Sequence, residues 1–193
     1  MVTDKSEPAR CRWCGTDPLY CDYHDREWGV PLRDDRQLFE LLILEGFQAG
    51  LSWITVLRKR EGFREAFSGF DPEFMAAYRQ ADFARLMGNP GIVRNRLKIE
   101  SSAINARAFL RVREELGSFA DFVWSFTGGV TLRDPEGMDP SRIRATSPES
   151  DAMSKELLRR GFKFVGSTIC YAFMQASGMV DDHTEGCWRY QAR

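Results

Sequence analysis

Residues 11–24 read CRWCGTDPLYCDYH, and residues 183–187, near the other end of the chain, read HTEGC. The two segments hold both histidines of the protein and most of its cysteines. Four of these side chains have the spacing of a metal site, Cys-x12-His followed by His-x3-Cys: Cys11, His24, His183 and Cys187. Zn²⁺ favours thiolate and imidazole ligands in a tetrahedral set of four. The pattern therefore predicts one structural Zn²⁺ ion that ties the N-terminal segment to the C-terminal segment.

The same residues allow two other interpretations. A compact site could form near the N-terminus alone, and its ligands would read C-x2-C-x6-C-x2-H: Cys11, Cys14, Cys21 and His24. Alternatively the residues are unrelated, and the cysteines are simply buried, as free cysteines often are. Spacing alone does not choose among the three interpretations.

Length and composition are those of one globular domain. The 193 residues are 43% hydrophobic and carry a net charge of −1, and a chain of this length can bury roughly 70% of its unfolded surface. Residues 1–10 are polar and are expected to form a disordered tail. Residues 11–193 are expected to form a single helical domain, which could consist of two sublobes with a pocket between them.

The cysteine count and the absence of apolar segments bear on location. Five cysteines are an odd number, and no apolar leader opens the sequence, so we expect a reducing, cytoplasmic environment. No uncharged apolar run approaches the ~18–20 residues of a membrane span. We therefore expect no membrane partner, and we expect a monomer.

No stretch shows the period-two alternation of a strand, so the sequence predicts an all-α fold, a helical bundle. Apolar periodicity and capping residues predict helices at about 35–45, 52–67, from 72 onward, 81–87, 94–116, 119–126, 150–160 and 167–178, with a long loop at 127–149. In the longest of these helices, the predicted apolar side consists of Leu97, Ile104, Ala108 and Val112.

A glycine turn, Gly88-Asn89-Pro90-Gly91-Ile92, separates two of the predicted helices. Gly88 and Gly91 would let the backbone approach a neighbour closely, and the free N–H groups of the following helix suit a phosphate. Arg94 and Arg96 would stand beside the same anion. Residues 91–113 carry six basic side chains against one acidic side chain, a balance that suits a polyanion partner. A plain corner between two helices with a solvated basic face is the alternative.

Aromatic residues are dense near the N-terminus and alternate with carboxylates. The aromatic side chains concerned are Trp13, Tyr20, Tyr23 and Trp28, with Trp53 further along the chain. Such clusters are usually core. The interleaved carboxylates instead indicate a pocket for a flat, electron-poor or cationic ligand, which aromatic faces attract through stacking and cation–π interaction.

Glu45 follows Leu41-Leu42-Ile43-Leu44 on a helix that is predicted to be buried. A lone buried carboxylate is costly unless a cation or a hydrogen-bond donor meets it. Glu45 is therefore a candidate for contact with the ligand. A salt bridge to an arginine, or a position at the helix end that reaches water, would explain it without a ligand.

Long, unusual strings in the chain resemble the DNA-3-methyladenine glycosylase I family. They are Cys11 with Trp13, DPLY (17–20), YHD (23–25), EWGVP (27–31), LEGFQAGLSW (44–53), RGFKFVG (160–166), TICYAFMQA (168–176) and Asp182-His183. The resemblance runs from about Cys11 to Cys187. It implies an all-helical enzyme with a helix-hairpin-helix element and a structural zinc site, which excises 3-methyladenine from alkylated double-stranded DNA.

The resemblance also implies roles for particular residues. The family's zinc ligands match Cys11, His24, His183 and Cys187, which favours the end-to-end site over the local one. Its base pocket matches Glu45, Tyr23 and Trp53 as catalytic residues, with Trp13, Tyr20 and Trp28 nearby as further binding residues. Cys14, Cys21 and the tail after Cys187 depart from the family's pattern.

Many helix-hairpin-helix glycosylases carry a catalytic aspartate or a lysine nucleophile after the hairpin, and neither is evident here. Lys98 lies too close to the turn, and Asp121 stands in a different string. Because 3-methylated adenine is cationic, it leaves as a neutral base and needs no general acid. We therefore expect a monofunctional glycosylase that flips the base, frames it with Trp53 and Tyr23, favours its charge with Glu45, and releases 3-methyladenine.

Two other classes of protein compete with this interpretation. A non-catalytic zinc module that binds nucleic acid would keep the Cys/His set and the basic helix but would not need Glu45. A thiol redox protein is suggested only by Cys11-x-x-Cys14, and it would require a βαβ context that the sequence does not predict.

Overall fold

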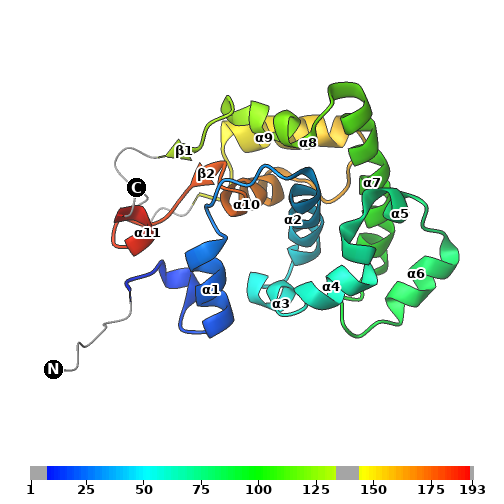
Figure 1. Ribbon diagram of the computed structural model, residues 1–193, viewed down its shortest axis with the longest axis horizontal. Helices are drawn as coiled ribbons and strands as arrows, with labels where there is room; N and C mark the ends of the chain where they lie inside the picture. The colour runs from blue at the N-terminus through cyan, green and yellow to red at the C-terminus, as the bar shows by residue number, and fades with distance from the viewer. Residues whose placement is uncertain (1–7, 134–143, 192–193) are drawn as a thin grey trace.

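The computed structural model describes residues 8–133 and 144–191, and their fold is mostly helical, as the sequence predicts. Helices α2 and α10 lie in the middle, between α8 and α9 on one side and α3 and α4 on the other (Figure 1). Helices α5, α6 and α7 form one end of the molecule, and α1 and α11 lie at the opposite end (Figure 1). The bounds are α1 Pro18–Arg26, α2 Asp35–Gln48, α3 Trp53–Leu57, α4 Arg60–Ala66, α5 Pro72–Ala76, α6 Gln80–Met87, α7 Arg96–Leu116, α8 Phe119–Trp124, α9 Pro148–Arg159, α10 Ser167–Ala176 and α11 Trp188–Gln191.

Short irregular elements complete the described fold. Three 3-10 turns cover Arg12–Cys14, Ser68–Phe70 and Ser125–Thr127. Two-residue strands, β1 (Leu132–Arg133) and β2 (Val180–Asp181), pair in parallel, whereas the sequence predicted no strand. Two residues are too few to show any alternation of apolar and polar side chains, so periodicity could not reveal them. None of the described helices is both long and apolar enough to cross a bilayer.

Helix α1 was not among the predicted helices, although its start carries a clear signal. Asp17 accepts hydrogen bonds from the backbone N–H groups of Leu19 and Tyr20, and Pro18 occupies the first helical position. The same Asp-Pro pair at Asp71 opens α5, where the sequence did predict a helix. The helix places Tyr20 and Tyr23 of the N-terminal aromatic cluster on one short element.

The helix predicted over residues 52–67 is divided into α3 and α4 around Arg58 and Lys59. A continuous helix would repeat the buried face of Val56 and Leu57 four residues later, at Arg60 and Glu61. The break leaves Glu61 exposed and Arg60 half-buried, while Phe63 is fully buried. The charged side chains thus stay at the surface although the chain continues as a second helix.

The predicted apolar side of α7 is wrong at its first member. Leu97 is 69% exposed, whereas Ala108 and Val112 are fully buried. In the first turn the buried side chains are Lys98 and Ile99, because the helix meets the end of α2 there through Lys98. The helix also begins at Arg96, two residues later than predicted, after the N-cap Asn95.

The turn between α6 and α7 is packed against α4. A Cβ atom on Gly62 would lie 2.5 Å from the carbonyl oxygen of Gly91, so the two backbones approach as closely as glycine allows. Lys59 Nζ donates to the carbonyl oxygen of Pro90 at 2.7 Å. The Asn89 side chain accepts from the Gly91 N–H at 2.7 Å and closes the turn.

The ends of the chain contact each other. Trp188 N–H donates to the carbonyl oxygen of Ala9 at 2.8 Å, and Arg10 forms an ion pair with Asp25. Ala9 and Arg10 therefore pack against the folded domain, whereas the sequence predicted that the disordered tail extends to residue 10. Residues 1–7 of that tail and residues 134–143 of the predicted loop lie outside the described residues.

Candidate active site and metal centre

A cavity of about 710 Å³ opens among α1, α2, α3, α10 and the segment after β2. Its lining contains every residue that the sequence predicted for a base pocket: Trp13, Tyr20, Tyr23, Trp28, Glu45 and Trp53. Residues far apart in the sequence therefore meet around one space, as the sequence predicted. Their roles toward a ligand remain a proposal.

The aromatic rings form a continuous wall, in which Trp13 stands edge to face with Tyr20 and Trp28, and Tyr23 is tilted against Trp53. Ring centroids of Trp13 lie 4.9 Å from those of Tyr20 and of Trp28, and Tyr23 lies 5.5 Å from Trp53. Tyr23 and Trp53 are buried, while Trp13 is 37% exposed at the mouth. The indole N–H of Trp53 is buried and has no hydrogen-bond partner among the described residues. Such a donor is available to a ligand with a polar edge.

Glu45 is 3% exposed, and its Oε2 atom has no hydrogen-bond partner among the described residues. No described arginine forms an ion pair with it, and it does not reach water at the helix end, so neither alternative explanation of this residue is realised. Burial raises the pKa of Glu45 to about 8. In the protein alone the side chain is therefore largely protonated at neutral pH, and a cation nearby would favour its ionised form.

Burial also acts on the neighbour of Glu45. It raises the pKa of Tyr23 well above its ordinary value, with the negative charge of Glu45 as the second cause. The phenol of Tyr23 therefore stays neutral across the physiological range. The cavity has a neutral aromatic wall and one carboxyl group whose charge depends on what it meets.

The opposite wall comes from α10 and the segment after β2, and the sequence did not predict it. Asp182 Oδ2 accepts hydrogen bonds from Tyr171 Oη and Gln175 Nε2, both at 2.7 Å. Gln175 and Asp182 line the cavity. Tyr171 and Gln175 are four residues apart and lie on one helix face, a spacing that could have indicated the pair.

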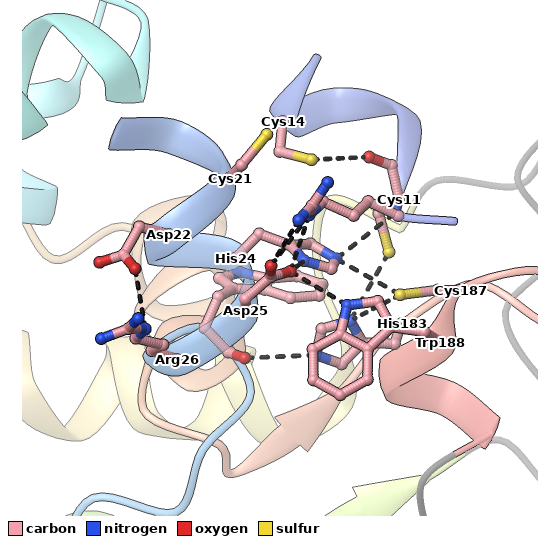
Figure 2. A network of polar contacts seen from close by, with 12 residues as sticks. Cys11, Cys14, Cys21, Asp22, His24, Asp25, Arg26, His183, Cys187 and Trp188 are labelled. Carbon is pink, nitrogen blue, oxygen red and sulfur yellow. Dashed lines mark hydrogen bonds and ion pairs between the residues drawn. The ribbon is translucent and has the colours of Figure 1, made fainter. Parts of the chain in front are cut away.

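The four predicted zinc ligands come together as a buried cluster between the two ends of the chain (Figure 2). Their ligand atoms all lie within 4.8 Å of one another. Cys187 Sγ lies 3.4 Å from His24 Nε2 and 3.6 Å from His183 Nδ1, and Cys11 Sγ lies 3.6 Å from His183 Nδ1. We call Cys11, His24, His183 and Cys187 the Cys/His cluster.

Surrounding groups orient the ligand atoms of the Cys/His cluster. His24 Nδ1 lies 2.8 Å from Asp25 Oδ1, and His183 Nε2 lies 3.2 Å from the carbonyl oxygen of Trp28. Both partners are acceptors, so these ring nitrogens donate and the other nitrogen of each ring presents a lone pair to the cluster. The backbone N–H of Thr184 donates to Cys11 Sγ at 3.4 Å, which suits a thiolate.

The local alternative does not form. Cys14 Sγ donates to the carbonyl oxygen of Cys11 at 3.1 Å (Figure 2). Cys21 Sγ donates to the carbonyl oxygen of Gly15 at 3.5 Å. Neither thiol belongs to the Cys/His cluster.

The donor set fits a zinc ion by its chemistry and spacing. Zn–S and Zn–N bonds of ~2.3 and ~2.0 Å place tetrahedral ligand atoms about 3.3–3.8 Å apart. The shortest separations in the cluster, 3.4 and 3.6 Å, lie in that range. Burial raises the pKa of the Cys11 thiol to about 11, and a divalent cation is the kind of charge that reverses such a shift.

The family model described as methyladenine glycosylase matches residues 13–190 of this chain. The chain belongs to the methyladenine glycosylase family. It is 51% identical over 181 residues to DNA-3-methyladenine glycosylase 1 of Escherichia coli (strain K12), covering 94% of this chain and 96% of that protein. The resemblance identified from the sequence strings is thereby confirmed.

Solved structures of family members share the fold. A crystal structure of 3-methyladenine DNA glycosylase I superposes with a TM-score of 0.88 at 53% identity, covering 93% of this chain and 98% of that chain. A structure from Staphylococcus aureus, described as showing the basis of 3-methyladenine recognition, superposes with a TM-score of 0.87 at 38% identity, covering 93% and 95% of the two chains.

In this family member the predicted DNA-contacting residues lie around the α6–α7 turn. Gly88 and Gly91 are part of the turn, and Arg94 and Arg96 follow it as exposed side chains. Arg96 forms an ion pair with Glu100 at 2.8 Å. Lys98 was included in the predicted basic region, but its side chain is buried and does not belong to that surface. Its ammonium group binds two backbone carbonyls.

We expect Glu45→Gln to stabilise the protein increasingly as the pH rises from about 5 to about 8.5. The pKa of Glu45 is about 8 in the folded chain against an ordinary value of 4.5. Between these values the native state holds one more proton than the unfolded chain, so the free energy of unfolding of the wild type falls as the pH rises. Glutamine does not titrate, and the gain should reach roughly 4 kcal/mol near pH 8.

Denaturant unfolding of both proteins across this pH range measures the difference. Glu65→Gln is the matched control, because Glu65 is an exposed side chain on α4 and should give no pH-dependent gain. A stability difference between wild type and Glu45→Gln that does not change with pH would contradict the burial of a titrating carboxyl.

Proposed function

We propose that this family member is a DNA repair glycosylase that flips 3-methyladenine out of alkylated double-stranded DNA and hydrolyses its N-glycosidic bond, leaving an abasic site. The observation that carries the proposal is Glu45, a buried carboxyl without a described partner, in a cavity walled by aromatic rings. The names of the relatives support it, as does a solved variant of 3-methyladenine DNA glycosylase I in complex with 3-methyladenine, which is 38% identical to this chain with a TM-score of 0.87.

The cavity suits a flat cationic purine. Tyr23 and Trp53 offer ring faces to the flipped base, with Trp13, Tyr20 and Trp28 around them. A positive charge on the base lowers the pKa of Glu45, so Glu45 loses its proton when the base binds. The carboxylate that forms then attracts the cationic base. Neutral adenine brings no such charge, and it leaves Glu45 protonated. Electrostatics in a desolvated cavity therefore favours the damaged base.

The chemistry needs no covalent residue. As the bond between the sugar and the purine breaks, its electron pair enters the ring and cancels the positive charge of the base. Water adds to the oxocarbenium-like sugar carbon and gives a proton to solvent. Lys98 is not available as a nucleophile, because its ammonium group binds the carbonyl oxygens of Phe47 and Ala49 outside the cavity lining.

The decisive experiment measures release of 3-methyladenine from methylated duplex DNA under single-turnover conditions. We expect the wild type to release the base and Glu45→Gln to do so about 10–100-fold more slowly, because the amide keeps the shape of the side chain but loses its charge. Glu65→Gln should match the wild type.

Two results would count against the proposal. Wild-type protein that binds DNA without releasing a base would instead indicate the non-catalytic nucleic-acid-binding module. Equal excision rates for wild type and Glu45→Gln would show that the charge of Glu45 does not contribute to base excision.

We propose that the Cys/His cluster holds one structural Zn²⁺ ion. The ion would cross-link the N-terminal segment, through Cys11 and His24, to the C-terminal segment, through His183 and Cys187. Asp25 and the carbonyl of Trp28 would keep its imidazole ligands in position.

The wild type should hold about one zinc ion per chain. Cys187→Ser should lose most of this zinc and should also be less stable to heat, because metal binding is coupled to folding. Elemental analysis of the purified protein measures the first effect. Cys14→Ser is the matched control, since Cys14 is a buried thiol outside the cluster, and it should leave the zinc content unchanged. Loss of metal from Cys14→Ser but not from Cys187→Ser would place the ion elsewhere.

We propose that α6, its turn and α7 form a helix-hairpin-helix element that contacts the DNA backbone through the turn, Arg94 and Arg96. Arg94 is exposed and forms no ion pair with the described residues, whereas Arg96 must release Glu100 to bind phosphate. Arg94 therefore contributes more to binding than Arg96.

We expect Arg94→Ala to weaken binding to every duplex sequence alike and to reduce the slope of log affinity against log salt by about one unit. Titrations of a fluorescent duplex at several salt concentrations measure this slope. Lys155→Ala on α9 removes an exposed charge away from the turn and should leave the slope unchanged. An unchanged slope for Arg94→Ala would show that another face holds the DNA.

A further inference from the structure

Lys98 is a buried cation that the proposed chemistry does not use. It is the third residue of α7 and is 6% exposed. Its Nζ atom donates to the carbonyl oxygens of Phe47 at 2.9 Å and Ala49 at 2.5 Å. No acidic side chain among the described residues forms an ion pair with it. Lysine is almost never buried without a partner, so these two carbonyls account for its position.

The two carbonyls belong to the C-terminal end of α2. The last carbonyls of a helix lack partners within it and carry the negative end of its dipole, which a lysine stabilises. Ala49 is the C-cap of α2, and Glu45 lies one turn before it. After Ala49 the chain passes Gly50, whose φ is +81°, and reaches Trp53 at the start of α3. Lys98 therefore holds the backbone between two residues of the cavity.

The other side of Lys98 leads to the α6–α7 turn. Its backbone N–H donates to the N-cap side chain of Asn95 at 3.2 Å, and Arg94 and Arg96 stand on either side of Asn95. The side chain and backbone of this one residue thus join the start of α7 to the end of α2.

We propose that Lys98 is a positioning residue for base excision, because its hold on the end of α2 fixes Glu45 and Trp53 relative to the turn that contacts the DNA backbone. The inference rests on the proposed function and adds a residue outside the cavity to it. A flipped base stays attached to its sugar and phosphates, so the separation between backbone contact and pocket must be constant. Misplacement by about 1 Å can slow such a reaction by about a hundredfold.

The role is carried by the backbone rather than by charge at the base. No ion pair or hydrogen bond among the described residues joins Lys98 to Glu45, because the Lys98 ammonium group binds the carbonyls of Phe47 and Ala49. Lys98 is therefore distinct from an ion-pair partner of Glu45. Its loss should displace Glu45 rather than change the ionisation of that side chain.

Lys98→Met tests the proposal, because methionine has a similar length but donates no hydrogen bond. Loss of the donor leaves the carbonyls of Phe47 and Ala49 without their partner, so stability should fall, and excision is compared on protein that circular dichroism shows to be folded. We expect single-turnover excision of 3-methyladenine from methylated duplex to slow by about 10–100-fold, and the tryptophan fluorescence change on adding free 3-methyladenine to require more ligand. Affinity for undamaged duplex should stay the same. Lys155→Met, an exposed lysine on α9, is the matched control and should match the wild type.

A double-mutant cycle separates positioning from a merely structural role. If Lys98 acts through Glu45, most of the loss caused by Lys98→Met should disappear in the Glu45→Gln background. Losses that simply add would contradict the proposal. If Lys98→Met does not fold, as judged by circular dichroism, Lys98→Gln takes its place in the same cycle, because its amide is too short to reach both carbonyls, and the same losses and non-additivity are expected.

The remaining outcomes separate this proposal from the proposed function. Active wild type together with an equally active, folded Lys98→Met would overturn the role of Lys98 alone. Wild type that releases no 3-methyladenine would overturn the proposed function and this inference with it.

Discussion

The cavity exists because the N-terminal segment closes onto the C-terminal segment. Trp13 and Tyr20 supply one wall, and Gln175 and Asp182 supply another. The Cys/His cluster adjoins both walls, since the ring of His24 lies 5.3 Å from the ring of Trp13 and His183 follows Asp182 in the chain. Trp28 belongs to both sites, because its ring lies 4.6 Å from the ring of His183 and also lines the cavity. The contact between the two ends therefore sets the shape of the cavity.

Within that cavity, Glu45 works against stability. A desolvated carboxyl without a partner is unfavourable in a folded chain, and apolar packing of the rest of α2 must offset its cost. Leu38, Phe39 and Leu42 on the same helix are essentially fully buried and provide such packing. The cost of Glu45 is explained if its partner is the ligand. An interaction that forms only with a cationic base lets the enzyme discriminate between that base and a neutral one.

The sequence predicted the site better than it predicted the boundaries of the fold. The aromatic residues of the first wall stand within a short stretch, and Glu45 stands out because it interrupts an apolar helix. The carboxylates interleaved with those aromatic residues do not line the cavity, contrary to the prediction, because they form ion pairs with arginines instead. Gln175 and Asp182 gave a weaker signal, because the four-residue spacing of Tyr171 and Gln175 is also common on ordinary helix surfaces, and a lone aspartate is common on any surface. The division between α3 and α4 was readable in Arg60 and Glu61, whereas the two-residue strands left no periodic pattern at all.

The basic stretch after the turn shows why charge counts overstate a nucleic-acid surface. Arg107 and Arg111 donate to the backbone carbonyls of Ala76 and Arg160, and Lys98 does the same for the end of α2. These side chains join helices to one another, so some of their hydrogen-bond donors are already used within the protein. Of the two arginines predicted beside the anion, Arg94 and Arg96, only Arg94 is exposed without an ion pair to the described residues. A narrow contact of this kind supplies modest, sequence-independent affinity. Discrimination between damaged and undamaged DNA must then come from the cavity, where a flipped base meets Glu45, rather than from the surface that holds the duplex.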